Sequence, residues 1–274
     1  MLTAGSLGYC QEILATKTSE LSIAAAPSSD SPTPSSDKDT SPGPTASTDD
    51  GWHLGVAPYL WFPGAHGTVG GPNRQASFSA SAGDLLANFR FGLMGLVDLR
   101  HNRLVLPIDV MWVRLADDKA LPFPNIPATT ASLKGSEFLL TPKVGYRMVD
   151  LQKLKIDGLV GFRYWHFGQS LQFSPSRLGL TFSGSEDWVD PLVGARMRAT
   201  LSRKLEATIA GDVGGGGVTS KQDYQVAGVL GYRIKPKWVL LVGYRYLYVD
   251  YRTGGAILTC TTSGVLLGVS INLK

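Results

Sequence analysis

Histidine, serine and acidic side chains could support acid–base or nucleophilic catalysis in this 274-residue chain, but they are scattered along it. His166 ends a predicted strand, and Glu186 with Asp187 closes the long connection after it, so a histidine and two carboxylates could share one rim. The nearest base and nucleophile in sequence are His166 and Ser170, whose spacing matches no known arrangement. The other histidines are His53, His66 and His101. We therefore expect no catalytic residues, with rim catalysis as the least favoured alternative.

Motifs for phosphate, metal or nucleic acid binding are also weak. The glycine run 214–217 precedes Thr219, Ser220 and Lys221, but it lacks the Gly-Lys-Ser/Thr order of a phosphate loop. The two cysteines, Cys10 and Cys260, form no redox or metal-binding pair. The formal net charge of +4 is too small and too dispersed to indicate nucleic acid binding. The sequence therefore predicts no cofactor, no metal site and no nucleic acid partner.

The elements that would position any site are amphipathic strands. Apolar or aromatic residues alternate with charged residues and glycine, and a period of two is typical of a pleated strand. No window holds the roughly 20 consecutive apolar residues of a spanning helix. Ten segments show the alternation, the eighth of them marked by Tyr224, Val226, Leu230 and Tyr232. The other nine are residues 52–62, 89–100, 103–115, 136–148, 154–166, 188–201, 205–215, 238–251 and 264–274.

Connection lengths indicate how these strands are joined. Tight turns follow the second, fourth, sixth and eighth segments, and long polar loops such as 63–87 and 116–134 separate others. This arrangement predicts an all-β fold, a closed antiparallel up-and-down transmembrane β-barrel over residues 51–274. Ten strands are favoured, and eight remain open. Residues 1–50, rich in Ser, Pro, Thr and Asp, are predicted to be a disordered tail with a mis-called or degenerate export signal.

The two faces of the wall are predicted to differ in charge. Alternation alone also fits a soluble barrel with an apolar interior, but the aromatic residues form two girdles around an aliphatic band, as in a membrane barrel. The predicted interface aromatics are Trp52, Trp112, Tyr146, Tyr164, Tyr232, Trp238, Tyr246 and Tyr248. The residues predicted to line the lumen are Arg90, Asp98, Asp109, Glu137, Lys143, Arg147, Lys155, Asp157, Arg163, Asp190, Arg196, Arg198, Glu206, Asp212, Arg233 and Arg245.

These lumen charges allow two interpretations. Nine basic and seven acidic groups on neighbouring strands could form ion pairs that plug the lumen, which is favoured because a ten-stranded barrel is narrow. Alternatively, an excess of arginine could line a narrow path for anions.

Several short motifs resemble known barrels. They are Pro58-Tyr59-Leu60-Trp61, Pro63-Gly64, Gly67-Thr68, Asp190-Pro191-Leu192-Val193-Gly194, Gly211-Asp212-Val213-Gly214 and Gly243-Tyr244-Arg245-Tyr246. Over about residues 52–274 the chain resembles the small outer-membrane β-barrel proteins of Gram-negative bacteria, of opacity-type or porin-like kind. The resemblance implies an integral position in the outer membrane and no shared catalytic residues.

The expected role is non-enzymatic, either structural or in surface interactions of the cell envelope. A narrow porin or small-solute channel is the alternative, and a barrel enzyme with its site at the rim is less favoured. The expected partners are the lipid bilayer and an extracellular ligand bound through the long loops.

Overall fold

The computed structural model describes residues 51–71, 74–121, 129–174, 180–253 and 255–273. The predicted tail, residues 1–50, lies outside the described residues. The elements in chain order are β1 (Trp52–Gly71), β2 (Arg74–Ala80), α1 (Ala82–Ala87), β3 (Phe89–His101), β4 (Leu104–Leu121), β5 (Thr129–Asp150), β6 (Leu154–Ser174), β7 (Leu180–Thr200), β8 (Leu205–Gly214), β9 (Ser220–Lys235), β10 (Trp238–Thr253) and β11 (Ala256–Asn272).

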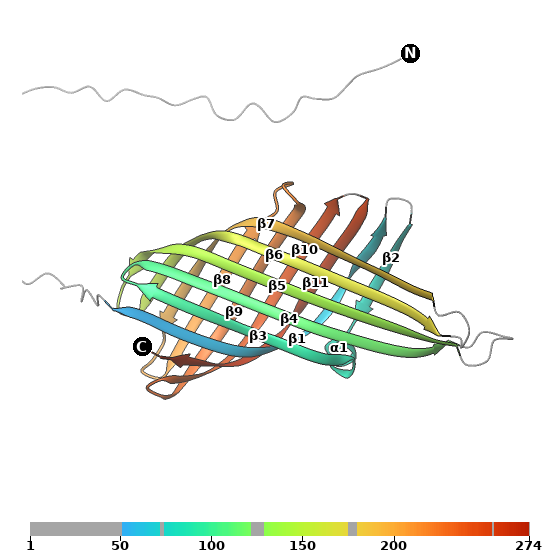
Figure 1. Cartoon of the computed structure of the whole chain (residues 1–274). Coiled ribbons are helices and arrows are strands. Elements are labelled where there is room, and N and C mark those ends of the chain that lie inside the picture. The colour runs from blue at the N-terminus through green and yellow to red at the C-terminus, as the bar shows by residue number, and fades with distance from the viewer. Residues whose placement is uncertain (1–50, 72–73, 122–128, 175–179, 254, 274) are drawn as a thin grey trace, which may run out of the picture. The chain divides into compact units, whose positions relative to one another are not determined.

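Ten of these strands form a closed antiparallel barrel (Figure 1). Each pairs with its neighbour in chain order from β3 to β11, and β1 completes the circle by pairing with both β3 and β11. The eleventh strand, β2, lies outside this circle and pairs with the second half of β1. The predicted ten-stranded up-and-down barrel is therefore confirmed, and the eight-stranded alternative is wrong.

Short turns and long connections lie at opposite ends of the barrel. The turns β3–β4, β5–β6, β7–β8 and β9–β10 are each two to four residues long, and we call this the short-turn end. The start of β1 and the end of β11 lie at this same end (Figure 1), since Trp52 pairs with His101 beside the β3–β4 turn and Asn272 pairs with Gly55. Within the described residues, no helix is both long and apolar enough to cross a membrane.

The predicted long loops are shorter than expected, because the strands continue into them. Residues 63–87 contain the second half of β1, all of β2 and the helix α1, whose N-terminus is capped by reciprocal bonds between Ser81 and Asp84. β4 to β7 likewise extend past the predicted strand ends, and Glu186 and Asp187 belong to β7 instead of a loop. These extensions form the long-loop end of the barrel.

The strand extensions form two separate lobes at the long-loop end. β7 pairs with β6 from Leu180 onward but with β8 only from Leu192, so β4 to β7 extend beyond β8. On the other side β2, β1, β11 and β10 continue together up to Gly71 and Thr253. We call these the β4–β7 lobe and the β1–β11 lobe.

The apolar face of the wall points outward. Val242 is 47% exposed and Leu230 is 51% exposed, whereas Arg245 on the other parity of β10 is 2% exposed. The interior is crowded enough to require glycine at some inward positions. A Cβ on Gly161 would lie 2.2 Å from the Pro142 carbonyl oxygen, closer than real contacts allow.

Candidate functional site

The inward side chains of β6 show how the lumen is layered. From the short-turn end to the long-loop end they are Lys155, Asp157, Leu159, Gly161, Arg163, Trp165, Phe167 and Gln169. Charged residues lie near the short-turn end, which we call the lower end, and one buried arginine lies in the middle. Aromatic residues follow above it, toward the long-loop end. Arg163 has no exposed surface and Trp165 is 3% exposed, so the middle of the lumen is filled.

A cluster of two cations and two carboxylates lies at mid-height, and we call it the central cluster: Lys143, Arg163, Asp212 and Asp223. Arg163 donates to Asp212 Oδ1 at 2.7 Å and also pairs with Asp223. Lys143 pairs with the second oxygen of Asp212. The formal charges cancel, as buried ions require.

On the short-turn side of the central cluster, a second network of alternating charges, which we call the lower ladder, joins five strands. Arg147 Nε donates to Asp157 at 2.9 Å, and Arg196 contacts both Asp157 and Asp98 at 2.9 and 3.0 Å. Arg198 continues from Asp98 at 3.2 Å to Glu206 at 3.3 Å. Three cations and three carboxylates again cancel.

Above the central cluster, an apolar and aromatic layer fills the lumen. Trp188 stacks between Trp165 and Tyr251, with ring centroids 5.4 and 4.2 Å apart. Each indole N–H group of this layer has an acceptor. Trp165 Nε1 donates to Asp223 at 3.1 Å, Trp188 Nε1 to Asp190 at 3.0 Å, and Trp61 Nε1 to the Gly264 carbonyl oxygen at 3.3 Å. The remaining buried members include Trp61, Met94, Met111, Leu139, Leu247, Val249 and Leu266.

Two cavities lie on opposite sides of these layers. The short-turn cavity, about 610 Å³, reaches Lys155 and Leu159 on β6. The long-loop cavity, about 230 Å³, reaches Phe167 and Gln169 on the same strand. The two share no lining residue, and Arg163 and Trp165 lie between them along β6.

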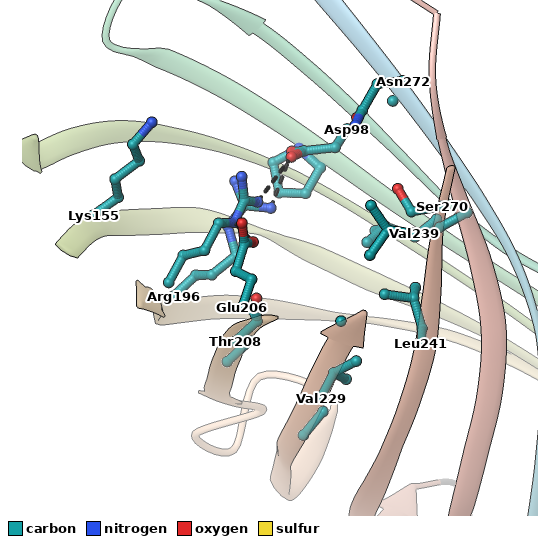
Figure 2. Close-up of a pocket in the computed structure, with 18 of the residues that line it drawn as sticks. Asp98, Lys155, Arg196, Glu206, Thr208, Val229, Val239, Leu241, Ser270 and Asn272 are labelled. Atoms are coloured by element: carbon teal, nitrogen blue, oxygen red, sulfur yellow. Dashed lines mark hydrogen bonds and ion pairs between the residues drawn. The ribbon is translucent and has the colours of Figure 1, made fainter. Parts of the chain in front are cut away.

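The short-turn cavity has a charged side and an apolar side (Figure 2). Asp98, Arg196 and Glu206 come together on one side. On the opposite side, Val229 and Leu241 extend from β9 and β10. This geometry suits a ligand with both a charged and an apolar part.

The long-loop cavity lies between the two lobes. Glu186 and Trp188 come from β7 of one lobe, and Tyr251 and Leu258 come from the other. The Tyr251 hydroxyl donates to Glu186 Oε2 at 3.3 Å, which joins the lobes across the cavity. This cavity is an aromatic cup with one carboxylate at its edge.

The predicted rim histidine forms a pair, but on the outer face of the wall. His166 Nδ1 lies 2.8 Å from Asp187 Oδ1, and the Tyr164 hydroxyl donates to the same oxygen at 2.6 Å. These hydrogen bonds, first from Tyr164 and then from His166, hold the pKa of Asp187 below its usual range. All three side chains share the parity opposite to Trp165 and Trp188, so the wall separates this pair from the cup. Among the described residues, no three His, Cys, Asp or Glu side chains are placed to hold a metal ion.

The structure places the other predicted lumen residues as follows. Asp109 pairs with Arg245 at 3.0 Å, and Asp190 accepts from the backbone and hydroxyl of Ser220. Glu137 is half-buried, and Arg233 is exposed at the mouth of the short-turn cavity. Arg90 is also exposed, at an irregularity where the β3–β4 register shifts between Phe89 and Phe91.

The predicted interface aromatics all lie on the outward parity. Trp52, Tyr146, Tyr232 and Trp238 are about half exposed near the short-turn end. Trp112, Tyr164, Tyr246 and Tyr248 are partly exposed further along the wall.

Sequence reasoning did not identify the inward aromatic residues. The spacing of the residues could have revealed them, because residues two positions apart in a strand share a face. Trp165 lies two residues from Arg163, and Trp188 lies two residues from Asp190. It also omitted Arg100, which shares the parity of Asp98 and lines the short-turn cavity.

Comparisons with known proteins support the fold. No protein-family model and no curated protein matches the sequence. Among solved structures, the outer membrane protease OmpT from Escherichia coli is similar, with a TM-score of 0.52 and 9% identity over 83% of this chain and 98% of that one. The translocator domain of the autotransporter NalP from Neisseria meningitidis has a TM-score of 0.43 and 15% identity, covering 81% of this chain and 89% of that one. Ail, the attachment invasion locus protein of Yersinia pestis, has a TM-score of 0.35 and 12% identity, covering 82% and 99%. The chain therefore has a fold found in outer-membrane β-barrels, and no narrower family follows.

Proposed function

We propose that this chain is an integral outer-membrane protein with a closed lumen, and that it acts without catalysis, by binding partners at its long-loop end. The membrane assignment is supported by the outward aliphatic belt, in which Val193, Leu230 and Val242 are each about half exposed. A continuous apolar surface that extends over so many strands is energetically unfavourable in water. Closure of the sheet also satisfies the backbone polar groups, as hydrocarbon requires.

The filled middle of the lumen is the observation that carries the proposal of a closed barrel. The short-turn and long-loop cavities end on either side of Arg163 and Trp165, and Leu139 and Leu247 are 1% and 2% exposed in the same region. Because the central cluster is electrically neutral and bonded across four strands, opening it would break several ion pairs at once. Because a barrel with a closed lumen offers no path for a solute, this observation supports a role in binding other molecules.

The long-loop end offers the surface for such contact. In outer-membrane barrels the longer connections face the outside and the short turns and termini face the periplasm. The two lobes would then project from the cell, with the aromatic cup between them.

A fractionation experiment tests the location. We expect the native protein in the outer-membrane fraction, with a heat-modifiable shift on gels that reports the closed barrel. Recovery in the soluble fraction would contradict the proposal.

Conductance in planar bilayers tests the closed lumen. We expect the wild-type protein to give no steady current. The variant Arg163→Ala with Trp165→Ala, which removes one large side chain from the central cluster and one from the aromatic layer, is expected to conduct, whereas the outward pair Val226→Ala with Leu230→Ala should stay silent. A steady wild-type current would instead favour the second candidate function, a narrow channel, for which the basic short-turn cavity is the supporting observation.

A further inference from the structure

The short-turn cavity contains more positive charge than its own carboxylates balance. Nine of its lining residues are Lys or Arg and three are Asp or Glu. All three acids are already engaged: Asp98 and Glu206 belong to the lower ladder, and Asp109 pairs with Arg245. An excess of cations inside a narrow wall produces a focused positive potential.

Five cations of this lining take no close part in the ion pairs described above. Within the described part of the chain, Arg100, Arg203, Lys204 and Arg233 have no ion pair, and Lys155 reaches Asp150 only at 4.0 Å. They come from β3, β6, β9 and the β7–β8 turn, so they surround the mouth of the cavity instead of covering one patch. We call these five residues the basic ring.

A further donor lies at the inner end of the cavity. Arg245 is 2% exposed and lies over the Trp61 ring, with its guanidinium carbon 5.0 Å from the ring centroid. Its Nη1 is engaged with Asp109 and Tyr59, but Nε and Nη2 are buried without a hydrogen-bond acceptor among the described residues. Buried N–H groups of this kind normally have a partner, which a bound group could supply.

The wall between the basic ring and Arg245 is partly apolar. Val229, Val239 and Leu241 line it from β9 and β10, opposite the charged residues of β6 to β8 (Figure 2). A volume of about 610 Å³ falls in the range of small-molecule sites.

We propose that the short-turn cavity binds a soluble organic anion that carries a phosphate or carboxylate group on an apolar body. The basic ring attracts and holds the anionic group, and the β9–β10 wall packs against the apolar part. A membrane lipid is a poor occupant, because its acyl chains would have to cross a wall in which every neighbouring pair of barrel strands is hydrogen-bonded. If the short turns face the periplasm, as the proposed function has it, the ligand is a periplasmic solute.

Titration calorimetry with 1-naphthyl phosphate tests this inference on the full chain, refolded in an uncharged maltoside detergent. We expect saturable binding to the wild-type protein that weakens with added salt, and weaker binding of inorganic phosphate, which lacks the apolar body. The variant Arg100→Gln with Arg233→Gln should bind the probe at least about a hundredfold more weakly, roughly tenfold for each cation removed. Val239→Ser should weaken naphthyl phosphate without changing the affinity for inorganic phosphate.

The matched control is Arg103→Gln with Lys237→Gln, which removes two cations from the same end of the barrel but outside the cavity lining. It should bind like the wild type, and all variants should keep the heat-modifiable shift. No saturable binding to the wild type, or equal losses in the two charge-removing variants, would overturn the inference. Neither result bears on conductance, so the closed-lumen proposal stands or falls separately.

Discussion

Replacing the arginine of the central cluster should reveal how strongly the filled lumen depends on charge balance. Arg163 has no exposed surface and donates to Thr141 Oγ1 at 3.3 Å and Asp212 Oδ1 at 2.7 Å, besides its pair with Asp223. In Arg163→Met, Asp212 keeps Lys143 as a partner, but Asp223 keeps only the Trp165 indole N–H. An uncompensated buried charge costs about 3–5 kcal/mol, which is the destabilisation we expect.

A second substitution separates the charge effect from lost packing. Asp223→Asn in the same chain removes the unpaired carboxylate, so Arg163→Met with Asp223→Asn should recover most of the loss, to within about 1–2 kcal/mol of the wild type. The free energy of unfolding can be measured in phospholipid vesicles by guanidinium titration, with tryptophan emission as the signal. Arg103→Met, at an exposed turn, serves as the control and should behave like the wild type.

The reasoning would be refuted if Arg163→Met cost less than about 1 kcal/mol, or if the double variant were as unstable as the single one. The first result would mean that water reaches the cluster and solvates Asp223. The second would mean that the arginine acts mainly through packing.

Two further predictions concern the wall. Val242→Arg should destabilise the protein in bilayers by about 2–4 kcal/mol, because Val242 faces outward between the two girdles. The control Val218→Arg, in the exposed β8–β9 loop, should leave the stability unchanged. Equal tolerance of both substitutions would contradict the membrane assignment. Gly161→Ala should lower the free energy of unfolding by about 1–3 kcal/mol in the same titration, since its Cβ would meet the Pro142 carbonyl. The control Gly228→Ala places its Cβ in open space and should leave the stability unchanged. Equal stability of the two variants would contradict the close approach at Gly161.

The barrel was predictable from the sequence because a strand between lipid and a polar lumen must alternate. A period of two puts Val242 and Arg245 on opposite faces, and the aromatic girdles indicate that the face of Val242 is the outward one. Which charges pair could not be predicted in the same way. Arg163 was among the predicted lumen residues, whereas Asp223, which immediately precedes the first marked residue of the eighth segment, was not. The two lie 60 residues apart, and their contact depends on the curvature and register of the barrel.

The strand extensions were missed for a related physical reason. Beyond the lipid, the outward face of a strand meets water and need not be apolar, so regular alternation is no longer imposed. Residues 63–71 and 167–174 therefore read as loops although they are strands. A sequence pattern of this type detects the membrane-facing part of a barrel strand, and underestimates strands that project from it.

The same argument explains the His166–Asp187 pair without catalysis. Toward the long-loop end, the outward residues of β6 are Val160, Phe162, Tyr164 and His166. On the antiparallel strand β7, Val189 lies opposite Tyr164 and Asp187 lies opposite His166. Apolar side chains thus give way to an aromatic residue and then to a hydrogen-bonded polar pair, as expected where a wall passes from lipid through the interface into water. A polar pair on the outer face just beyond the girdle satisfies its own hydrogen bonds there. The part of the rim able to enclose a ligand is on the other face, where Glu186, Trp188 and Tyr251 form the cup.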